Sequence, residues 1–250
     1  MDPDLTNIAD YDDAPDIPFP YEEKCLGDHV TDEQSANIAN MSFKDISIGN
    51  YWNINNIQYR IMSINQFYNY NGIITPHVVV MPDSVFRNHM YNKLPTNDGG
   101  YLHSDLKNYI GSTYNSFIRK AFGKNHILSH THDLTSSDRG KFTLAPTRNV
   151  KAWLINSYNL DGSKYLYEFD YNWQDADKTQ FPAFKYSANL RVTREKTQRC
   201  ITRHIGKKWW LGTPMNTNRS TDFCVINAYG NICMYSSDYS YGIRPAFLVY

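Results

Sequence analysis

The stretch K-W-W-L-G-T-P, from Lys208 to Pro214, and the final stretch Y-G-I-R-P-A-F-L-V-Y, from Tyr241 to Tyr250, decide how we read this chain. Between them lies F-C-V-I-N-A-Y-G-N-I-C-M-Y, from Phe223 to Tyr235. Two apolar runs around a turn dipeptide are typical of a β-hairpin. We therefore predict a strand, a hairpin and a closing strand at the C-terminal end, with the rest of the chain as a frame around them.

Two of the four cysteines fall inside this predicted hairpin. If Tyr229-Gly230 forms a two-residue turn, Cys224 faces Tyr235 rather than Cys233, which argues against a disulfide between the two cysteines. The sequence has no C-x-x-C spacing. Few cysteines without such a motif fit a chain made in a reducing compartment, although the pairing of these two stays open.

Charge is unevenly distributed along the 250 residues. The first 23 residues hold eight acids and no Lys or Arg, which leaves the remainder with 25 basic and 17 acidic residues, a net charge of +8. An acidic, proline-containing leader without apolar periodicity predicts an extended arm. We place this arm at residues 1–42 and one domain at 43–250; composition alone leaves open whether the arm is a solvated tail or an anchor.

No segment has the features of a secretion signal or a membrane span. The N-terminus lacks a basic region followed by an apolar one, and no run of about 18 apolar residues occurs. We therefore expect synthesis in the cytoplasm and no membrane span.

Apolar periodicity and turn signals predict the main elements of an α+β domain. Asn55-Asn56 tolerates the positive φ angles of a type I′ turn between two alternating runs. Ser104 is a good N-cap and Gly123 a good residue after the last helical turn. The predicted elements are a hairpin at 46–64, a strand at 77–81, a long helix at about 105–122, a short helix at about 149–157, and a loop with one short strand at 164–186.

Three histidines, His126, His130 and His132, lie close in sequence and raise the question of a metal site. His130 and His132 would point to one side of a strand, where imidazoles are able to bind zinc or iron. No carboxylate or cysteine stands at a familiar ligand spacing. We favour ordinary polar loop histidines, with no metal and no cofactor, and keep the metal site as the alternative.

Residues 191–208 contain seven basic residues and one acid, and Trp209-Trp210 follows them. A basic groove with aromatic side chains is one interpretation, since nucleic acids bind such grooves. A solvated strand pair is the other, and we favour it because the domain is not strongly basic overall. The sequence contains none of the common nucleophile, phosphate-loop, dinucleotide or zinc-protease motifs, so we predict that the protein is not an enzyme.

Three C-terminal motifs resemble those of a known domain. W-W-L-G-T-P, V-I-N-A-Y-G-N and G-I-R-P-A-F are similar to W-W-L-R-S-P, V-n-x-x-G-x and G-V-R-P-A-F, the signatures of a domain common in clostridial-type bacteria and their phages. That domain is similar to the formylglycine-generating-enzyme branch of the C-type lectin fold, which phage tropism determinants also use. Upstream segments, beginning with F-K-D-I-S-I-G-N-Y-W at Phe43, resemble virion structural proteins of tailed phages.

The resemblance implies a C-type-lectin-like fold with antiparallel sheets and hairpins, and it gives roles to individual residues. The residues of the fold signature are Trp209, Trp210, Leu211, Gly230, Gly242, Arg244, Pro245 and Phe247, the last four in one closing strand. Gly212-Thr213 stands where the family usually has Arg-Ser. The variable ligand-binding surface would contain Asn216, Asn218, Arg219, Tyr235, Asp238, Tyr239 and Tyr241.

These observations lead to a non-enzymatic protein of the virion surface, made in the host cytoplasm, as a head fibre or decoration or as a tail adhesin. The arm would bind other virion proteins through Asp12, Asp13, Ile17, Phe19 and Tyr21, and the domain would attach to a host glycan. We expect a homo-oligomer, with a trimer favoured, and no nucleic acid. A purely structural cement protein is the alternative, and a copper oxidase using Cys224 and Cys233 is the least favoured.

Overall fold

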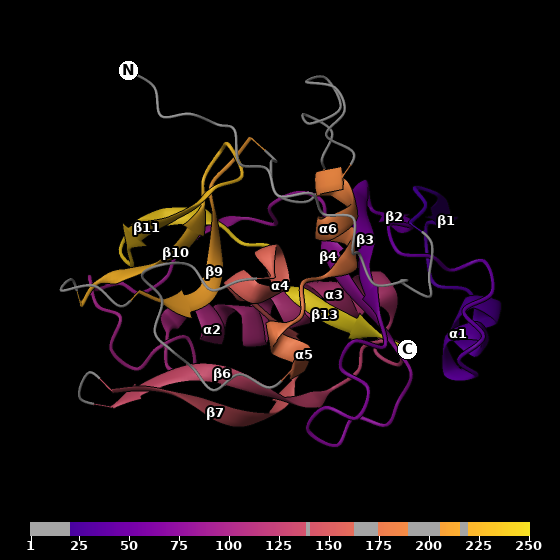
Figure 1. Cartoon of the computed structure of the whole chain (residues 1–250), viewed down its shortest axis with the longest axis horizontal. Coiled ribbons are helices and arrows are strands. Elements are labelled where there is room, and N and C mark those ends of the chain that lie inside the picture. The colour runs from indigo at the N-terminus through magenta and orange to yellow at the C-terminus, as the bar shows by residue number, and fades with distance from the viewer. Residues whose placement is uncertain (1–20, 139–140, 163–174, 190–205, 216–219) are drawn as a thin grey trace.

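Two β-sheets and a separate two-stranded ribbon make up the framework of the molecule (Figure 1), a computed structural model that describes residues 21–138, 141–162, 175–189, 206–215 and 220–250. The six-stranded sheet has the order β1 (Cys25–Gly27), β2 (Tyr51–Ile54), β3 (Ile57–Ile64), β4 (Val78–Pro82), β13 (Ala246–Val249) and β8 (Ala152–Trp153). The five-stranded sheet has the order β11 (Ile232–Ser236), β10 (Asp222–Ile226), β9 (Trp209–Pro214), β12 (Ser240–Gly242) and β5 (Asn88–Met90). The ribbon pairs β6 (His130–Asp138) with β7 (Lys141–Val150).

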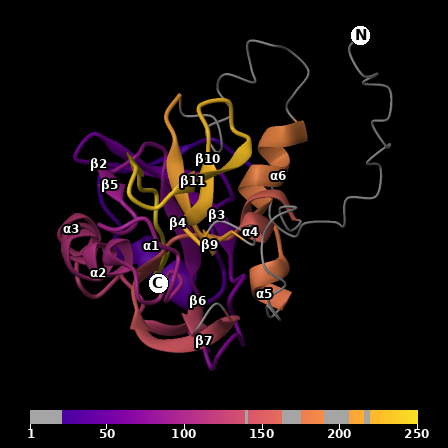
Figure 2. The same cartoon turned by 90° about the vertical axis from the view of Figure 1, so that its left-hand side faces the viewer.

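Most strand pairs are antiparallel, which confirms the predicted α+β class at this level. β1 pairs with β2 and β12 pairs with β9 in parallel. The helical segments are short, and α4 (Ser157–Asp161), α5 (Asp175–Lys178) and α6 (Pro182–Asn189) lie together on one side of the molecule (Figure 2). Within the described part of the chain, no helix is long and apolar enough to cross a membrane.

The first hairpin and the strand after it are confirmed. β2 and β3 are joined by Asn55 and Asn56, whose φ angles of 52° and 62° are those that the Asn-Asn dipeptide predicted. β4 follows at Val78–Pro82 and pairs with both β3 and β13. Every residue of β4 is buried, as a β-branched run in the middle of a sheet requires.

The helix predicted at 105–122 consists of three consecutive segments. α2 (Asp105–Tyr109) begins at the N-cap Ser104, whose side chain accepts a hydrogen bond from the Lys107 N–H. A π-helical turn, η1 (Ile110–Tyr114), and then α3 (Asn115–Phe122) follow. The wide turn places one extra residue in the middle of the helix, which apolar spacing alone does not reveal.

The N-terminal segment from residue 21 to 42 is not the extended arm that its composition predicted. It contains β1 and the helix α1 (Asp32–Ala39). Thr31 and Gln34 form a reciprocal capping box, and the Gln34 side chain also accepts a hydrogen bond of 2.9 Å from Trp52 Nε1. The motif T-D-E-Q carries this start signal, and we missed it because the surrounding residues lack an apolar stripe.

The prediction of a short helix at 149–157 is wrong. These residues form the end of β7 and all of β8, and α4 begins only at Ser157 after the N-cap Asn156. Val150, Trp153 and Leu154 recur at helical spacing, but their backbone is extended and their side chains are buried from there. Within the loop that we predicted at 164–186, residues 175–178 are helical, and so are residues 182–186, which begin the helix Pro182–Asn189.

We predicted one closing strand, but this stretch forms two strands that belong to different sheets. β12 ends at Gly242 in the five-stranded sheet, and β13 begins at Ala246 in the six-stranded sheet. Arg244 lies at this crossing, fully buried: its Nε donates a 2.9 Å hydrogen bond to the Pro82 carbonyl, and its guanidinium lies 4.8 Å from the ring centroid of Trp209. Burial lowers the pKa of Arg244 to about 10. Arg244 thus connects the two sheets.

Candidate functional site

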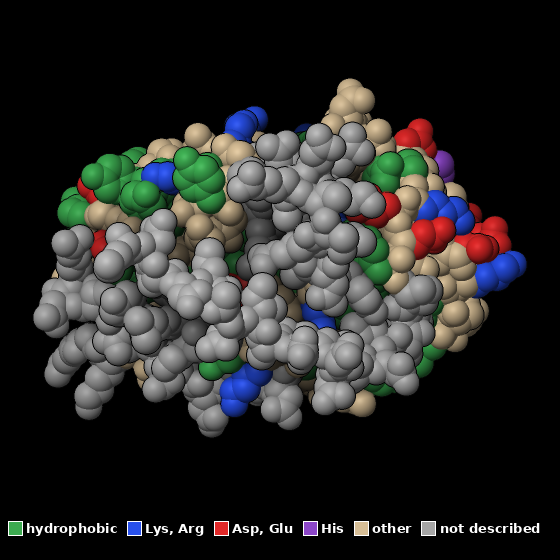
Figure 3. Space-filling view, turned by 45° about the horizontal axis from the view of Figure 1, so that its top comes forward, with side chains coloured by type: hydrophobic (Ala, Val, Ile, Leu, Met, Phe, Trp, Pro, Cys, Tyr) green, Lys and Arg blue, Asp and Glu red, His purple; other side chains and the backbone are tan. Residues whose placement is uncertain are grey.

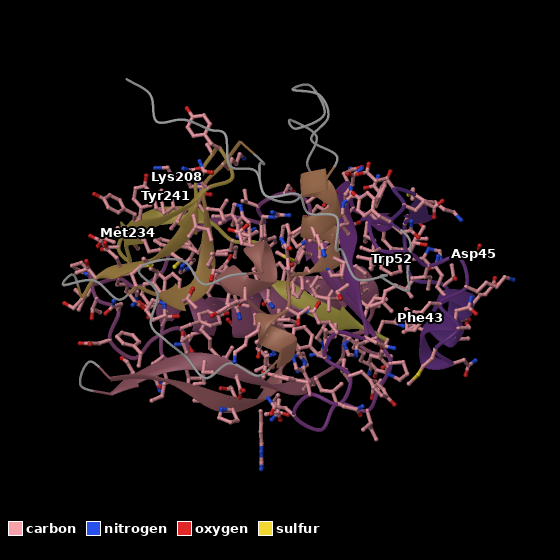
Figure 4. All side chains as sticks on the ribbon, in the orientation of Figure 1. Phe43, Asp45, Trp52, Lys208, Met234 and Tyr241 are labelled. Atoms are coloured by element: carbon pink, nitrogen blue, oxygen red, sulfur yellow. The ribbon has the colours of Figure 1, made fainter. Side chains whose placement is uncertain are left out.

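Three tyrosines and a lysine gather on the five-stranded sheet, and we call Lys208, Tyr235, Tyr239 and Tyr241 the tyrosine surface. Lys208 immediately precedes β9, and its carbonyl accepts a 2.9 Å hydrogen bond from the Gly242 N–H. This contact places the lysine beside Tyr241 on β12. Tyr235 is on β11, and Tyr239 is in the turn that leads from β11 to β12. Figure 4 shows Lys208 and Tyr241 next to each other.

The lysine and the rings are in direct contact. Lys208 Nζ donates a 2.6 Å hydrogen bond to the Tyr235 hydroxyl and lies 4.0 Å from the centroid of the Tyr235 ring and 5.2 Å from that of Tyr241. The Tyr235 and Tyr241 centroids are 4.9 Å apart with ring planes at 69°. The Tyr239 and Tyr241 centroids are 6.1 Å apart at 27°. These distances and angles suit cation–π contacts to the lysine, an edge-to-face pair of Tyr235 with Tyr241 and a stacked pair of Tyr239 with Tyr241.

The electrostatics of the tyrosine surface keep the lysine charged. The hydrogen bond to Tyr235 is the main cause that raises the pKa of Lys208. Partial burial raises the pKa of Tyr241 and also that of the nearby Cys233 thiol, so both stay protonated at neutral pH. The surface therefore presents one fixed cation beside the neutral phenol of Tyr241.

Solvent reaches this surface. The Tyr239 side chain is 55% exposed, and every residue of β11 is half-buried because this strand is at the edge of its sheet. Hydrophobic side chains gather around a basic group at the end of the molecule that carries β10 and β11 (Figure 3). Exposed aromatic faces with hydroxyl groups are suited to contact a ligand that has both apolar faces and hydrogen-bonding groups.

The structure brings together three of the seven predicted ligand-binding residues, Tyr235, Tyr239 and Tyr241. Asp238 is exposed in the turn beside Tyr239. Asn216, Asn218 and Arg219 lie outside the described residues. Sequence reasoning missed Lys208, which it counted in a solvated basic run; its role depends on the pairing of β9 with β12, and no local pattern reveals that pairing.

The residues of the fold signature are buried as a group: Trp209, Trp210, Leu211, Gly230, Gly242, Arg244, Pro245 and Phe247. Gly230 has φ 83° in the loop between β10 and β11. Gly212, which stands where the resemblance led us to expect an arginine, donates a 2.8 Å hydrogen bond to the Ile155 carbonyl, and a Cβ there would lie 2.5 Å from the Leu154 carbonyl oxygen. The close approach of β9 to the Leu154–Ile155 backbone explains this glycine.

A family model described as "Domain of unknown function (DUF6273)" matches residues 75–250, from just before β4 to the C-terminus. The chain belongs to this family. The tyrosine surface lies within the matched residues, whereas β1, β2 and β3 precede them and complete the six-stranded sheet. No curated protein and no solved structure matches the chain.

The two hairpin cysteines of the DUF6273 domain do not face each other. Cys224 is opposite Met234, and Cys233 is opposite Val225, so the predicted register with Cys224 opposite Tyr235 is wrong by one residue. The turn is longer than the two residues we predicted, because the Asn227 N–H donates to the Asn231 carbonyl. Neighbouring pairs point to opposite faces of the hairpin, and neither Cys224 nor Cys233 forms a disulfide among the described residues.

The three histidines of the DUF6273 domain differ in how deeply they are buried. His126 is half-buried near the C-terminal residue: its Nδ1 is 3.4 Å from the Tyr250 carbonyl oxygen. His130 and His132 are buried on β6 rather than in the polar loop that we expected. Burial lowers the pKa of His130 to about 4 and that of His132 well below its usual value. Among the described residues, no group of three or more His, Cys, Asp or Glu could hold a metal ion.

His132 belongs to what we call the buried cluster: Tyr70, His77, His130, His132 and Asp177. The Tyr70 hydroxyl donates a 2.5 Å hydrogen bond to Asp177 Oδ2, and His132 Nε2 is 3.6 Å from Asp177 Oδ1. Burial raises the pKa of Asp177 to about 7. A cavity of about 10 Å³ next to His132 has room for about one water molecule. This cavity is too small for a larger ligand, and Asp177 and His132 are buried, so the tyrosine surface is the better candidate site.

Proposed function

We propose that this chain is a non-enzymatic protein of a phage virion surface, with a C-type-lectin-like domain that attaches to a host-surface glycan through the tyrosine surface. The observation that carries the proposal is the exposed group of aromatic rings around Lys208. The resemblance of the C-terminal motifs to phage-borne domains supports the virion setting. Head fibre and tail adhesin are both compatible with this role.

The chemistry of the tyrosine surface favours a carbohydrate. A sugar ring has apolar C–H faces that pack on aromatic rings and hydroxyl groups that exchange hydrogen bonds with phenols and an ammonium group. The rings of Tyr235 and Tyr241 already touch each other and Lys208, so little side-chain freedom is lost on binding. Such a surface binds weakly as a single copy, and an oligomer, with a trimer favoured, would raise the avidity.

The N-terminal arm would anchor the protein to other virion components. Asp12, Asp13, Ile17 and Phe19 lie outside the described residues, so this role rests on their composition. Tyr21 is described, and it belongs to the domain: it forms a bridge with Ile48, and its ring covers Gly49 so closely that a Cβ there would overlap it. We therefore assign the anchor to residues 1–20 and no longer include Tyr21.

The binding role is tested with the full chain, in which Tyr239→Ala and Tyr241→Ala are combined, on a glycan array and on host cells. We expect binding to fall at least tenfold. Tyr229→Ala is the matched control, because Tyr229 is 81% exposed but lies in the loop after β10, outside the surface, and it should leave binding unchanged. Equal binding by the unchanged protein, the double variant and the control would show that the tyrosine surface does not bind the glycan.

The virion setting is tested separately by mass spectrometry of purified particles. The proposal requires the protein in particles of the phage that encodes it, and its absence would refute the virion role. Presence in particles together with no glycan or host-cell binding would favour the alternative, a structural cement protein. Deletion of residues 1–20 should give a folded domain that no longer joins the particles.

A further inference from the structure

A second surface, separate from the tyrosine surface, carries an open groove of about 450 Å³ along the outer face of η1 and α3. Four basic side chains and two serines line most of it: Arg119, Lys120, Lys124, Lys151, Ser112 and Ser116. In the described ranges of the chain, no acidic residue contributes to the lining. A concave surface lined by charges of one sign concentrates counter-ions of the other sign.

The fold holds the groove in place from below. Ile118 and Phe122 on the inner face of α3 are buried, and the Phe122 ring packs edge-on against Tyr59 and Phe247, with centroids 5.0 and 5.1 Å apart. Residues three and four apart lie on one face of a helix, which aligns Ser112, Ser116 and Lys120 on the outside. The positions of the groove residues on α3 are therefore fixed before any ligand arrives.

The positive charge of the groove is not neutralised by any residue that the structure describes. Among the described residues, none of the four basic side chains forms an ion pair, and residues 106–132 contain no Asp or Glu. Arg119 and Lys120 are in the last turn of α3, where the helix dipole favours cations. That explanation does not extend to Lys124, which follows the helix, or to Lys151, which comes from the segment between β7 and β8.

We propose that this groove binds an anionic polysaccharide that carries phosphate or sulfate groups. Lysine and arginine side chains bind such groups through charge-assisted hydrogen bonds, and serine hydroxyls are suited to pair with the sugar hydroxyls between them. A single-stranded nucleic acid is less well matched, because its bases are bound by stacking on aromatic side chains, and the described residues that line the groove include no aromatic one. The inference is independent of the tyrosine surface.

Gly111, which is exposed in η1, can be substituted to test the groove without disturbing the packing around it. A Cβ at this position would meet no atom within 4 Å, so a longer side chain fits there without displacing its neighbours. Gly111→Glu adds a carboxylate to the groove, and Gly111→Gln adds the same volume without charge. The pair separates repulsion of an anion from simple obstruction.

Binding is measured by calorimetry with the full chain and three probes: heparin as the sulfated polymer, poly(glycerol phosphate) as the phosphate polymer, and poly-dT. We expect at least one of the first two to bind, and to bind more weakly at 200 mM than at 50 mM NaCl because counter-ions are released on binding. Combining Arg119→Gln, Lys120→Gln and Lys124→Gln should lower the affinity at least tenfold, and Gly111→Glu should lower it severalfold more than Gly111→Gln.

Three exposed lysines outside the groove, changed together as Lys24→Gln, Lys44→Gln and Lys93→Gln, remove the same charge and should leave the affinity within about twofold. An equal loss in this control would show non-specific attraction and overturn the proposal. Binding of poly-dT more tightly than both other polymers would overturn it in favour of a nucleic acid. Circular dichroism checks folding, and if the triple variant does not fold, the two Gly111 variants decide. Tyr239→Ala with Tyr241→Ala should not change binding of these probes.

Discussion

The tyrosine surface and the buried cluster are built from similar side chains and behave in opposite ways. Each combines aromatic rings with titratable groups. On the tyrosine surface, Lys208 stays charged and its tyrosine neighbours reach solvent. In the buried cluster, Asp177 and His132 are 0% and 2% exposed. Burial raises the pKa of Asp177 and lowers that of His132, and both shifts favour the neutral form. Burial, rather than residue type, therefore decides which group stabilises the fold and which is available to a ligand.

The largest expected effect separates these two regions by stability. Trp153 is 1% exposed, and its ring centroid is 4.4 Å from that of His132 and 5.5 Å from that of Phe67. Replacing it in Trp153→Ala leaves a cavity in the buried cluster and should lower the free energy of unfolding by about 3–5 kcal/mol. Urea denaturation measures this loss, with Tyr229→Ala as the exposed control. A loss below about 1 kcal/mol would show that the cluster is not part of the core.

The second effect is a loss of stability in acid. The pKa values of His77 and His130 are lowered to about 4 in the folded state from the usual 6.5, because burial disfavours the imidazolium. Their neutral forms thus contribute stability that is complete above pH 6.5 and is lost as the pH falls towards 4. At pH 5 each loses about 2 kcal/mol relative to pH 7.5.

Asp177 works in the other direction. Its folded pKa of about 7 lies above the usual 3.8, so its protonated form stabilises the fold more as the pH falls from 7 to 4. It therefore offsets about 2.5 of the roughly 4 kcal/mol that the two histidines lose, and these three groups together should lower the free energy of unfolding by roughly 1.5 kcal/mol between pH 7.5 and 5. His132, whose pKa is also lowered by burial, adds to the loss. Urea denaturation at several pH values checks this, and equal stability at pH 7.5 and 5 would contradict it. Asp177→Asn should steepen the loss in acid.

An effect of similar size is expected when one hydroxyl is removed from the cluster. Tyr70 donates to Asp177 and accepts a 3.2 Å hydrogen bond from the Asp133 N–H. Tyr70→Phe should cost about 1–3 kcal/mol because both partners stay buried. The cost should be larger at pH 8 than at pH 5, since the ionised Asp177 carboxylate needs the donor more. Tyr68→Phe is the control, because the hydroxyl of the half-buried Tyr68 forms no hydrogen bond among the described residues. A cost that is equal at both pH values would mean that Asp177 does not titrate in this range.

Local signals in the sequence predicted the elements whose cause is local. Asn55-Asn56 marked the β2–β3 hairpin, and Ser104 and Gly123 marked the limits of the helical segment between them. The capping box at Thr31 was equally local and could have been found. The π-helical turn could not, because its hydrogen bonds shift without a change in apolar spacing.

The rest depends on contacts between distant residues. The split of the C-terminal stretch at Arg244 reflects two sheets that meet there, and the burial of His130 and His132 depends on Phe67, Trp153 and Asp177. Composition indicated the tyrosines of the candidate site. Lys208 joined them only through the parallel pairing of β9 with β12, which no periodicity encodes.

The smallest expected effect on stability is also the one that best distinguishes the tyrosine surface from the buried cluster. Tyr239 is more than half exposed, and its N–H donates a 3.1 Å hydrogen bond to the Ser236 carbonyl that an alanine would keep. Tyr239→Ala should therefore change the free energy of unfolding by less than about 0.5 kcal/mol. Urea denaturation measures this, and glycan binding by the same protein should fall. A loss of more than about 1.5 kcal/mol would mean that Tyr239 supports the fold, and weaker binding would then report on structure instead of contact.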